Sequence, residues 1–554
     1  MKQFIYLLFT MAFFSITFIN CEGDMLVIEE PEAGTEIASV TRYSTPLSCY
    51  YVTTKGDDTN SGSSEEKAWR TIKYAASIAK AGDTVYIKAG EYLDEHVVIV
   101  NSGTETEPIV FEGYRNRPGD KPQLKYDPFK NNKLDATIMP LLNGNDTTGR
   151  AFSITGKKFI EIKNIQITLY ERGINCTQRD PSCDYITLDN IIGTDFGFTS
   201  PNNSIKATRY SGLGIQIYGN NCKILNCIIV DAGGENFGIR GDYHLVDKCE
   251  SYSLTNHNPP DYFLHIGGDY NTIKNCKANN LGNNAPYGHG IGFKGDCKYN
   301  KVIDCVAENL QEDFLVRHPE CQYNEFINCT GIKHNAFVIR DNASNNTFRN
   351  CKSKDAWASV LFWDSAEPSG QDGGGFNNTI VNCIFETSST DPCIVFSNDT
   401  YPSNAQGNIF RNCVFSKGSK LFSGGSDLDK GNIMKNCIVT DVKALGENPL
   451  DFGIDITYSN FWKNGFKTPS GSGNMSKNPF FGGTSDFHLK SKYGRWNGTT
   501  WVKDHVTSPC IDAGDPADEY SKEPSPNGKK INIGAYGNTS EASKSTVKKK
   551  IVKY

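Results

Sequence analysis

A six-residue segment that ends in cysteine returns along the middle of this chain, and it limits the fold more than any other feature. Most copies begin with asparagine and carry asparagine or aspartate before the cysteine. The copies end at Cys227, Cys249 (a degenerate copy), Cys276, Cys305, Cys329, Cys351, Cys383, Cys413 and Cys437. Their spacing of 22 to 32 residues corresponds to one turn of a β-solenoid. We therefore predict an all-β chain, a single-stranded right-handed parallel β-helix (solenoid).

Equivalent positions of such a helix form columns, because each coil stacks on the next about 4.8 Å away. A cysteine column inside the helix is a small apolar stack, so these cysteines are predicted to be free and buried. The asparagines that precede them are predicted to bond to turn backbone and to their neighbours above and below. Other cysteines lie outside this column, and for them we hypothesise the disulfides Cys176–Cys183 and Cys297–Cys321.

The two ends of the chain differ from the repeat. Lys2 and the apolar stretch after it are typical of an export signal, and Cys21 is similar to the lipidated cysteine of bacterial lipoproteins. An ordinary secretory signal is the alternative. An Ala-rich amphipathic stretch that ends at Lys80 predicts an N-terminal capping helix over the open end of the core. The predicted divisions are a signal peptide at 1–20, an acidic linker at 21–47, a cap with the first coils at 48–130, the central β-helix with the groove at 131–445, C-terminal coils with a closing cap at 446–542, and a flexible basic tail at 543–554.

A second series of strands precedes the cysteine motif, and in coil after coil its apolar run ends in a polar, mostly basic residue. These residues are Arg240, His265, Lys294, Arg317, His318, Arg340 and Asp364. In a solenoid they would line one groove. The net charge of −6 gives no general attraction to nucleic acid, so a basic groove indicates an anionic ligand. Because the groove is extended, an acidic polysaccharide fits it best, and solvated charges at strand ends are the alternative.

Two neighbouring coils carry a local resemblance in Phe293-Lys294-Gly295, in Tyr299-Asn300 and in Leu315-Val316-Arg317-His318. These segments resemble the alginate lyase and chondroitinase B family of right-handed parallel β-helix polysaccharide lyases. The resemblance implies that Lys294 is the base and that Arg317 is the acid or the charge stabiliser.

The same family binds calcium through two glutamates that precede the lysine. Tyr287 and His289 stand near those positions in this chain, so the glutamate pair is absent. We therefore predict no metal ligand, and calcium stays open as a cofactor.

The chemistry of β-elimination explains why these residue types fit. The reaction removes the C5 proton of a uronate and expels the C4 oxygen. A cation must first neutralise the carboxylate, because the C5 proton is otherwise only weakly acidic. Neighbouring cations also lower the pKa of a lysine, which lets it act as the base. We predict Lys294, Arg317 and His289 as catalytic residues, with His289 as a possible proton donor. The residues predicted to bind substrate are Arg240, His265, His318, Arg340 and Asp364.

A β-helix glycoside hydrolase acting on an acidic polysaccharide is the main alternative. Gly288-His289-Gly290 is similar to a motif of polygalacturonases, and carboxylates for acid–base chemistry are available at Asp261, Glu312, Asp313 and Asp364. A uronate C5-epimerase and a non-catalytic glycan-binding lipoprotein also stay open. In every case we expect an exported monomer, held at the outer membrane or cell surface by a lipid on Cys21, or otherwise periplasmic or secreted.

Overall fold

The computed structural model describes residues 48–546, apart from 131–132, 177–179, 198–211, 255–259, 283–286, 364–372, 398–403 and 447–452. The predicted signal peptide, Cys21 as a lipid attachment site, Asp364 as a substrate ligand and most of the basic tail lie outside the described residues. Within the described part of the chain, no helix is long and apolar enough to cross a membrane.

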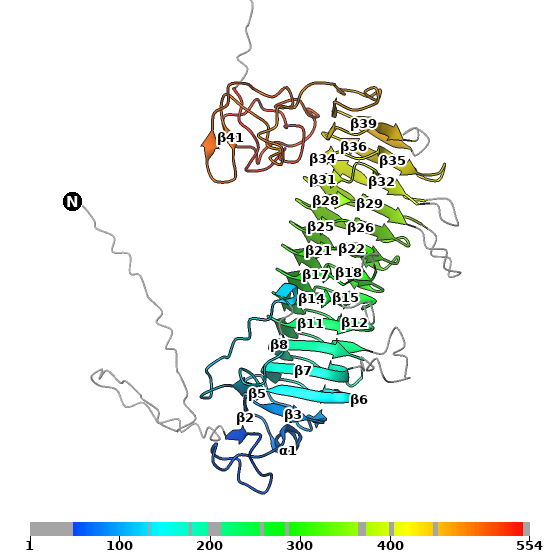
Figure 1. The fold of residues 1–554 in the computed structure, drawn as a ribbon. Helices are drawn as coiled ribbons and strands as arrows, with labels where there is room; N and C mark the ends of the chain where they lie inside the picture. Colours follow the sequence, from blue (N-terminus) through cyan, green and yellow to red (C-terminus); the bar gives the residue numbers. More distant parts are fainter. Residues whose placement is uncertain are drawn as a thin grey trace, which may run out of the picture.

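Parallel strands stack coil upon coil into a long solenoid (Figure 1), which confirms the predicted all-β parallel β-helix. Each central coil contributes one strand to each of three stacks, which we call stacks A, B and C. Stack A contains β9 (Leu213–Tyr218), β12 (Glu235–Arg240), β15 (Tyr262–Gly267), β18 (His289–Lys294), β22 (Glu312–Arg317), β26 (Asn335–Arg340), β29 (Ala358–Trp363), β32 (Pro392–Phe396), β35 (Lys420–Gly424) and β38 (Ala444–Gly446).

Stack B follows stack A within each coil, and stack C follows stack B. Stack B contains β10 (Lys223–Leu225), β13 (Leu245–Asp247), β16 (Thr272–Lys274), β20 (Lys301–Ile303), β24 (Glu325–Ile327), β27 (Thr347–Arg349), β30 (Thr379–Val381), β33 (Ile409–Arg411), β36 (Asn432–Lys435) and β39 (Ile454–Thr457). Stack C contains β11 (Ile228–Ala232), β14 (Glu250–Ser253), β17 (Lys277–Asn280), β21 (Val306–Glu308), β25 (Thr330–Ile332), β28 (Lys352–Ala356), β31 (Ile384–Thr387), β34 (Val414–Ser416), β37 (Ile438–Thr440) and β40 (Asn460–Trp462).

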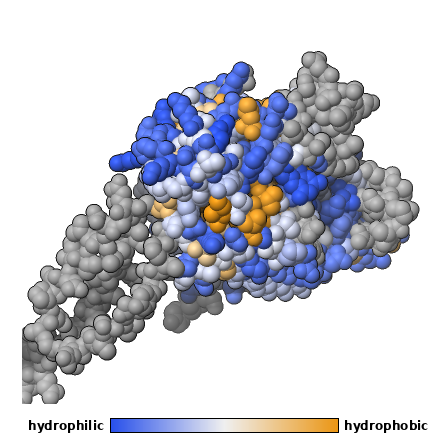
Figure 2. Space-filling model, turned by 90° about the horizontal axis from the view of Figure 1, so that it is seen from below, coloured by the Kyte–Doolittle hydropathy of each residue, from blue (hydrophilic) through white to orange (hydrophobic). Residues whose placement is uncertain are grey.

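The first coils are less regular, and a helix covers their open end. Their elements are β1 (Cys49–Val52), α1 (Ile72–Ile78), β2 (Thr84–Lys88), β3 (Glu91–Leu93), β4 (Val97–Val98), β5 (Ile109–Tyr114), a short 3-10 turn (Pro128–Lys130), β6 (Leu141–Ser153), β7 (Ile160–Asn175) and β8 (Thr187–Phe196). Thr71 caps α1 by accepting the Tyr74 N–H at 3.3 Å, and buried Glu95 accepts the N–H groups of Ile72 and Lys73. The predicted capping helix is confirmed. Figure 2 views this end and shows a mostly hydrophilic surface with small apolar patches.

The cysteine column behaves as predicted. The nine motif cysteines are free, and each is at most 1% exposed. The hypothesised Cys176–Cys183 disulfide is present. The hypothesised Cys297–Cys321 disulfide is wrong, because both thiols are free. These two residues are direct neighbours on β19 (Cys297–Lys298) and β23 (Cys321–Gln322), and each thiol donates to a backbone carbonyl, that of Ile266 or of Gly295.

The stacked asparagine column lies five residues before seven of the nine motif cysteines, and Cys222 and His244 stand at this position in the first two copies. Its side chains are buried and bond from coil to coil; for example, the Asn324 Nδ2 donates to Asn346 Oδ1 at 2.9 Å. The asparagine directly before the cysteine has another role, because it adopts the left-handed conformation that ends the strand, with φ of 55° at Asn275. Its amide reaches the previous coil from outside the core, as in the 2.8 Å bond from Asn275 to Asp247.

We expect Asn346→Ala to destabilise the fold by about 1–3 kcal/mol, because it leaves buried partners unsatisfied. Asn346 accepts from the Asn324 backbone N–H and donates to the Cys321 carbonyl, both at 3.0 Å. The midpoint of urea unfolding measures the effect. Asn116→Ala, at an exposed turn, is the matched control and should leave the midpoint unchanged. Equal midpoints for the two variants would contradict a stabilising ladder.

Beyond β40 the chain turns back along the outside of the solenoid. Apart from the antiparallel pair β41 (Arg495–Trp496) and β42 (Trp501–Val502), the described residues of this segment form turns and irregular structure. Its buried side chains, including Leu489, Ile511 and Ile533, pack on Val414 and Ile438 of stack C. This contact places the C-terminal segment beside the last coils (Figure 1).

Candidate active site

The strand register of stack A brings the predicted basic residues together. Lys294 on β18 lies directly beside Arg317 on β22, and Arg317 lies beside Arg340 on β26. His265 is not in this column, since the coil of His265 places Gly267 beside Arg240. Arg240, Lys294, Arg317 and Arg340 therefore end their strands of stack A, His265 lies two residues before the corresponding position on β15, and His318 follows the end of β22.

Glu312, at the start of β22, contacts two of the predicted site residues, His289 and Arg340. The carboxylate is fully buried and lies 2.7 Å from His289 Nδ1 and 2.7 Å from Arg340 Nη1. Burial alone would raise the pKa of Glu312, yet the neighbouring His289 and Arg340 hold that pKa below its ordinary value. Arg340 also stacks on Trp363, with its guanidinium carbon 4.1 Å from the ring centroid. Arg340 is thus a buried support of the groove more than an exposed ligand.

Two further carboxylates, Glu235 and Asp341, orient three other side chains of this face. Glu235 lies 2.7 Å from His265 Nδ1 and 2.5 Å from Arg240 Nη2, and His265 and Arg240 hold the pKa of Glu235 below its ordinary value against the opposing effect of burial. Asp341 accepts from Arg317 Nε at 2.5 Å. The guanidinium groups of Arg240 and Arg317 are therefore held in fixed orientations by their carboxylate partners.

Lys294 differs from its neighbours. Its half-buried ammonium forms no hydrogen bond or ion pair with any described side chain, and Nζ lies 5.7 Å from the ring centroid of Tyr262. Burial is the largest cause that lowers the pKa of Lys294, and the positive charges of Arg317 and Arg340 lower it further, while Asp261 opposes them. A lysine with a lowered pKa and no carboxylate partner is suited to accept a proton.

Tyr262 is a site residue that the sequence interpretation missed. It is 4% exposed and its ring packs between His265 and His289, with centroid distances of 4.4 and 4.5 Å. Its buried hydroxyl has no hydrogen-bond partner among the described residues. Burial raises the pKa of Tyr262, and the nearby Glu312 adds to that effect. Only the strand register could have revealed Tyr262 as a site residue, because it pairs with His289 on the next coil.

The described residues do not fit a family-type calcium site. No group of three or more His, Cys, Asp or Glu side chains suited to a metal occurs among them. The two glutamates of this face, half-buried Glu235 and buried Glu312, are already engaged by arginine and histidine.

Of the carboxylates considered for a hydrolase, Asp364 lies outside the described residues, and the three that the structure describes do not form a pair facing the groove. Asp313 is fully buried beside Gly331 of stack C, and burial raises the pKa of Asp313 well above its ordinary range. Glu312 is held by Arg340 and His289, as described above. Asp261 is half-buried and directly precedes β15. Among the described carboxylates, we find no acid–base pair for hydrolysis.

Comparison with known proteins places the fold. The molecule is a right-handed parallel β-helix protein: residues 50–314 match the family model described as "Pel9A-like, right handed beta helix region". This match confirms the predicted handedness and the resemblance to β-helix polysaccharide lyases, although the matching model is Pel9A-like. A second model, "Disaggregatase related", matches residues 364–514.

The similar proteins share little sequence with this chain. The Bacillus subtilis (strain 168) protein described as "Uncharacterized protein YwoF" is 42% identical over 66 residues, which is 12% of this chain and only 14% of that protein. The pectate lyase Pel9A structure is 14% identical, with 88% of this chain and 95% of that chain covered and a TM-score of 0.34. A PL6 family polysaccharide lyase from Pseudopedobacter saltans is 11% identical, with 71% and 91% covered and a TM-score of 0.42.

Proposed function

We propose that this protein is a polysaccharide lyase that cleaves a uronate-containing anionic polysaccharide by β-elimination. The observation that carries the proposal is the position of Lys294. It lies in direct register with Arg317 and has no carboxylate partner among the described residues, and its pKa is lowered. The Pel9A-like family match and the lyases of similar fold support the same reaction class.

The mechanism follows from these positions. Arg317, oriented by Asp341, binds the uronate carboxylate and makes the C5 proton more acidic. Neutral Lys294 takes that proton, the electron pair of the C–H bond forms the C4–C5 double bond, and the C4–O bond breaks. His289, oriented by Glu312 through Nδ1, donates a proton to the leaving oxygen from its other ring nitrogen. Arg240 and His318 contact neighbouring sugars, while His265 and Arg340 hold the floor of the groove.

The pH profile tests the link between Lys294 and Arg317. Activity should rise with pH, because the neutral form of Lys294 is the base and its pKa is lowered by burial and by Arg317. In Arg317→Gln the lost positive charge should raise that pKa, so the rising limb should move to higher pH. The measurement is kcat/KM against pH for both proteins. A lower plateau with an unmoved limb would contradict an electrostatic role of Arg317 on Lys294.

Ultraviolet absorbance on a panel of alginate, pectin, ulvan and glycosaminoglycans tests the reaction class. A lyase produces an unsaturated uronate that absorbs, whereas a hydrolase produces reducing ends without that absorbance. A C5-epimerase changes the uronate composition without cleavage, and a binding protein changes nothing. Reducing ends without absorbance would overturn the proposal and favour the hydrolase.

We also propose that the protein is exported and anchored by a lipid on Cys21, on the strength of the apolar segment before it. Expressed in a bacterium that exports it, the wild-type protein should fractionate with membranes, and Cys21→Ala should be released to the soluble fraction. Membrane association that survives in Cys21→Ala would contradict lipid anchoring at this residue.

A further inference from the structure

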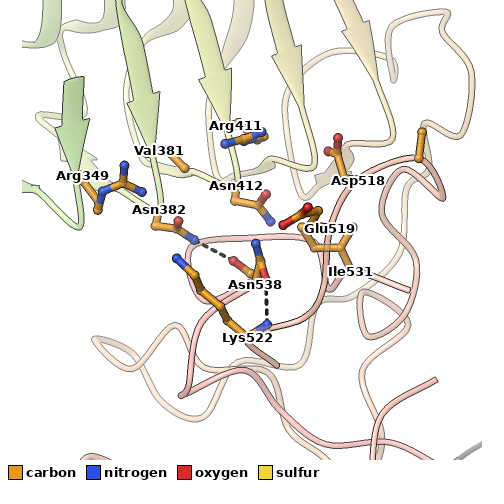
Figure 3. Close-up of a pocket in the computed structure, with 12 residues that line it drawn as sticks. Arg349, Val381, Asn382, Arg411, Asn412, Asp518, Glu519, Lys522, Ile531 and Asn538 are labelled. Atoms are coloured by element: carbon orange, nitrogen blue, oxygen red, sulfur yellow. Dashed lines mark hydrogen bonds between the residues drawn. The ribbon is translucent and has the colours of Figure 1, made fainter. Parts of the chain in front are cut away.

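A second polar site lies away from the groove, between stack B and the C-terminal segment. It is a cavity of about 340 Å³. One wall comes from β27, β30 and β33 and the opposite wall from residues 517–538 (Figure 3). Because stack A carries Lys294 and Arg317 and stack B carries this wall, the cavity is separate from the candidate active site.

Two arginines of stack B have their guanidinium groups in this cavity without a counter-ion. Arg349 pairs in register with Val381, and Val381 pairs with Arg411, so the two arginines are two coils, roughly 10 Å, apart. Neither forms an ion pair or a side-chain hydrogen bond with a described residue. Lys522 projects from the opposite wall (Figure 3) and likewise has no ion pair within the described ranges.

Lys435, the next cation of the same column, does have carboxylate partners. Lys435, beside Arg411 in register, lies 2.7 Å from Asp518 and 3.4 Å from Asp515. The C-terminal segment therefore neutralises Lys435 and leaves Arg349 and Arg411 open to an anion from outside. A planar guanidinium binds a carboxylate through two parallel hydrogen bonds, which suits this role.

The rest of the lining suits hydroxyl groups. Asn382 and Asn412 each donate their amide nitrogen to backbone of the C-terminal segment, to Gly537 at 2.8 Å and to Asn532 at 2.9 Å. These bonds fix both amides; Asn412 is buried, so the carbonyl oxygen of half-buried Asn382 is the acceptor that a ligand can reach. Glu519 adds an exposed carboxylate on the opposite wall. A ligand that satisfies this lining carries carboxylates together with many hydroxyls.

We infer that this cavity is an accessory binding site for a carboxylate-bearing segment of an acidic polysaccharide. Arg349 and Arg411 bind sugar carboxylates, and the amide oxygen of Asn382 accepts from a hydroxyl. The site holds a chain on a face of the β-helix that does not perform the reaction.

Affinity electrophoresis in gels that contain sodium polygalacturonate or sodium alginate tests this site. All proteins carry Lys294→Ala, so that no polymer is cleaved during the run. We expect the double variant Arg349→Ala with Arg411→Ala to raise the dissociation constant obtained from the retardation about tenfold, because charge-assisted hydrogen bonds are lost. The matched control is Lys301→Ala with Lys354→Ala, which removes the same charge from exposed positions on β20 and β28, also two coils apart. It should migrate like the parent.

Each other outcome overturns the inference. Equal retardation of the pocket variant and the control would show that the cavity does not bind the polymer. Equal loss on dextran sulfate would indicate general anion exchange, and no retardation of the parent on either polyuronate would exclude this ligand class. Circular dichroism confirms that the variants fold. Because the readout is binding, absence of lyase activity would disprove the proposed function without affecting this result.

Discussion

Lys294→Ala should lower kcat/KM for elimination by about 10³-fold or more, within the range measured for loss of a general base. The pKa of Lys294 is lowered, and among the described residues no carboxylate pairs with its ammonium group, whereas Arg317 beside it is paired with Asp341. Lys294→Arg should not restore activity, because a guanidinium stays protonated. The initial rate of the ultraviolet absorbance increase on the best substrate of the panel measures both variants.

The matched control for this prediction is Lys298→Ala, four residues further along the same coil. Lys298 pairs with exposed Asp296 outside the groove, so its loss should leave the rate within about twofold, as for surface pairs of little energetic weight. If Lys294→Ala kept near-normal elimination, the base would lie elsewhere, and Tyr262 would become the next residue to replace.

The sequence was sufficient to predict the coils and the pair Lys294 and Arg317. A spacing of 23 residues is one coil, and one coil of parallel pairing makes the two residues direct neighbours. It was also sufficient for the buried cysteine column, since the same position repeats nine times.

The supporting residues could not be predicted in the same way. Glu235 and Tyr262 open their strands five and three residues before the polar residues that drew attention, and nothing local marks them as groove residues. Only the register of three coils brings Glu235, Tyr262 and His289 into one column. The wrong disulfide has a similar cause. Equal position on neighbouring coils puts the backbones of Cys297 and Cys321 side by side, but their thiols donate to backbone carbonyls.

Glu312→Gln should destabilise the protein by about 3–5 kcal/mol, the usual effect of removing one partner from a buried ion pair. Arg340 is 5% exposed and would keep only the longer contact to Asp341, at 3.4 Å. Glu386→Gln is the matched control, because its partner Lys417 is largely exposed, and it should change stability by about 1 kcal/mol or less. Urea unfolding followed by circular dichroism compares the two variants. Similar midpoints would show that the Glu312 cluster does not stabilise the coil.

The sign of the pH dependence separates this effect from a simple packing defect. The pKa of Glu312 is below its ordinary value in the folded protein, so the carboxylate stabilises the fold above its unfolded pKa. That stabilisation is lost as the pH falls towards the folded pKa, and the difference between wild type and Glu312→Gln should shrink on acidification. A packing defect would be independent of pH. Replacing Glu312 together with Arg340, as Glu312→Leu with Arg340→Met, should recover part of the stability, because neither charge of this buried pair is then left unpaired, although His289 loses its carboxylate partner. The same double variant should still lose activity, since His289 no longer has the carboxylate that orients it.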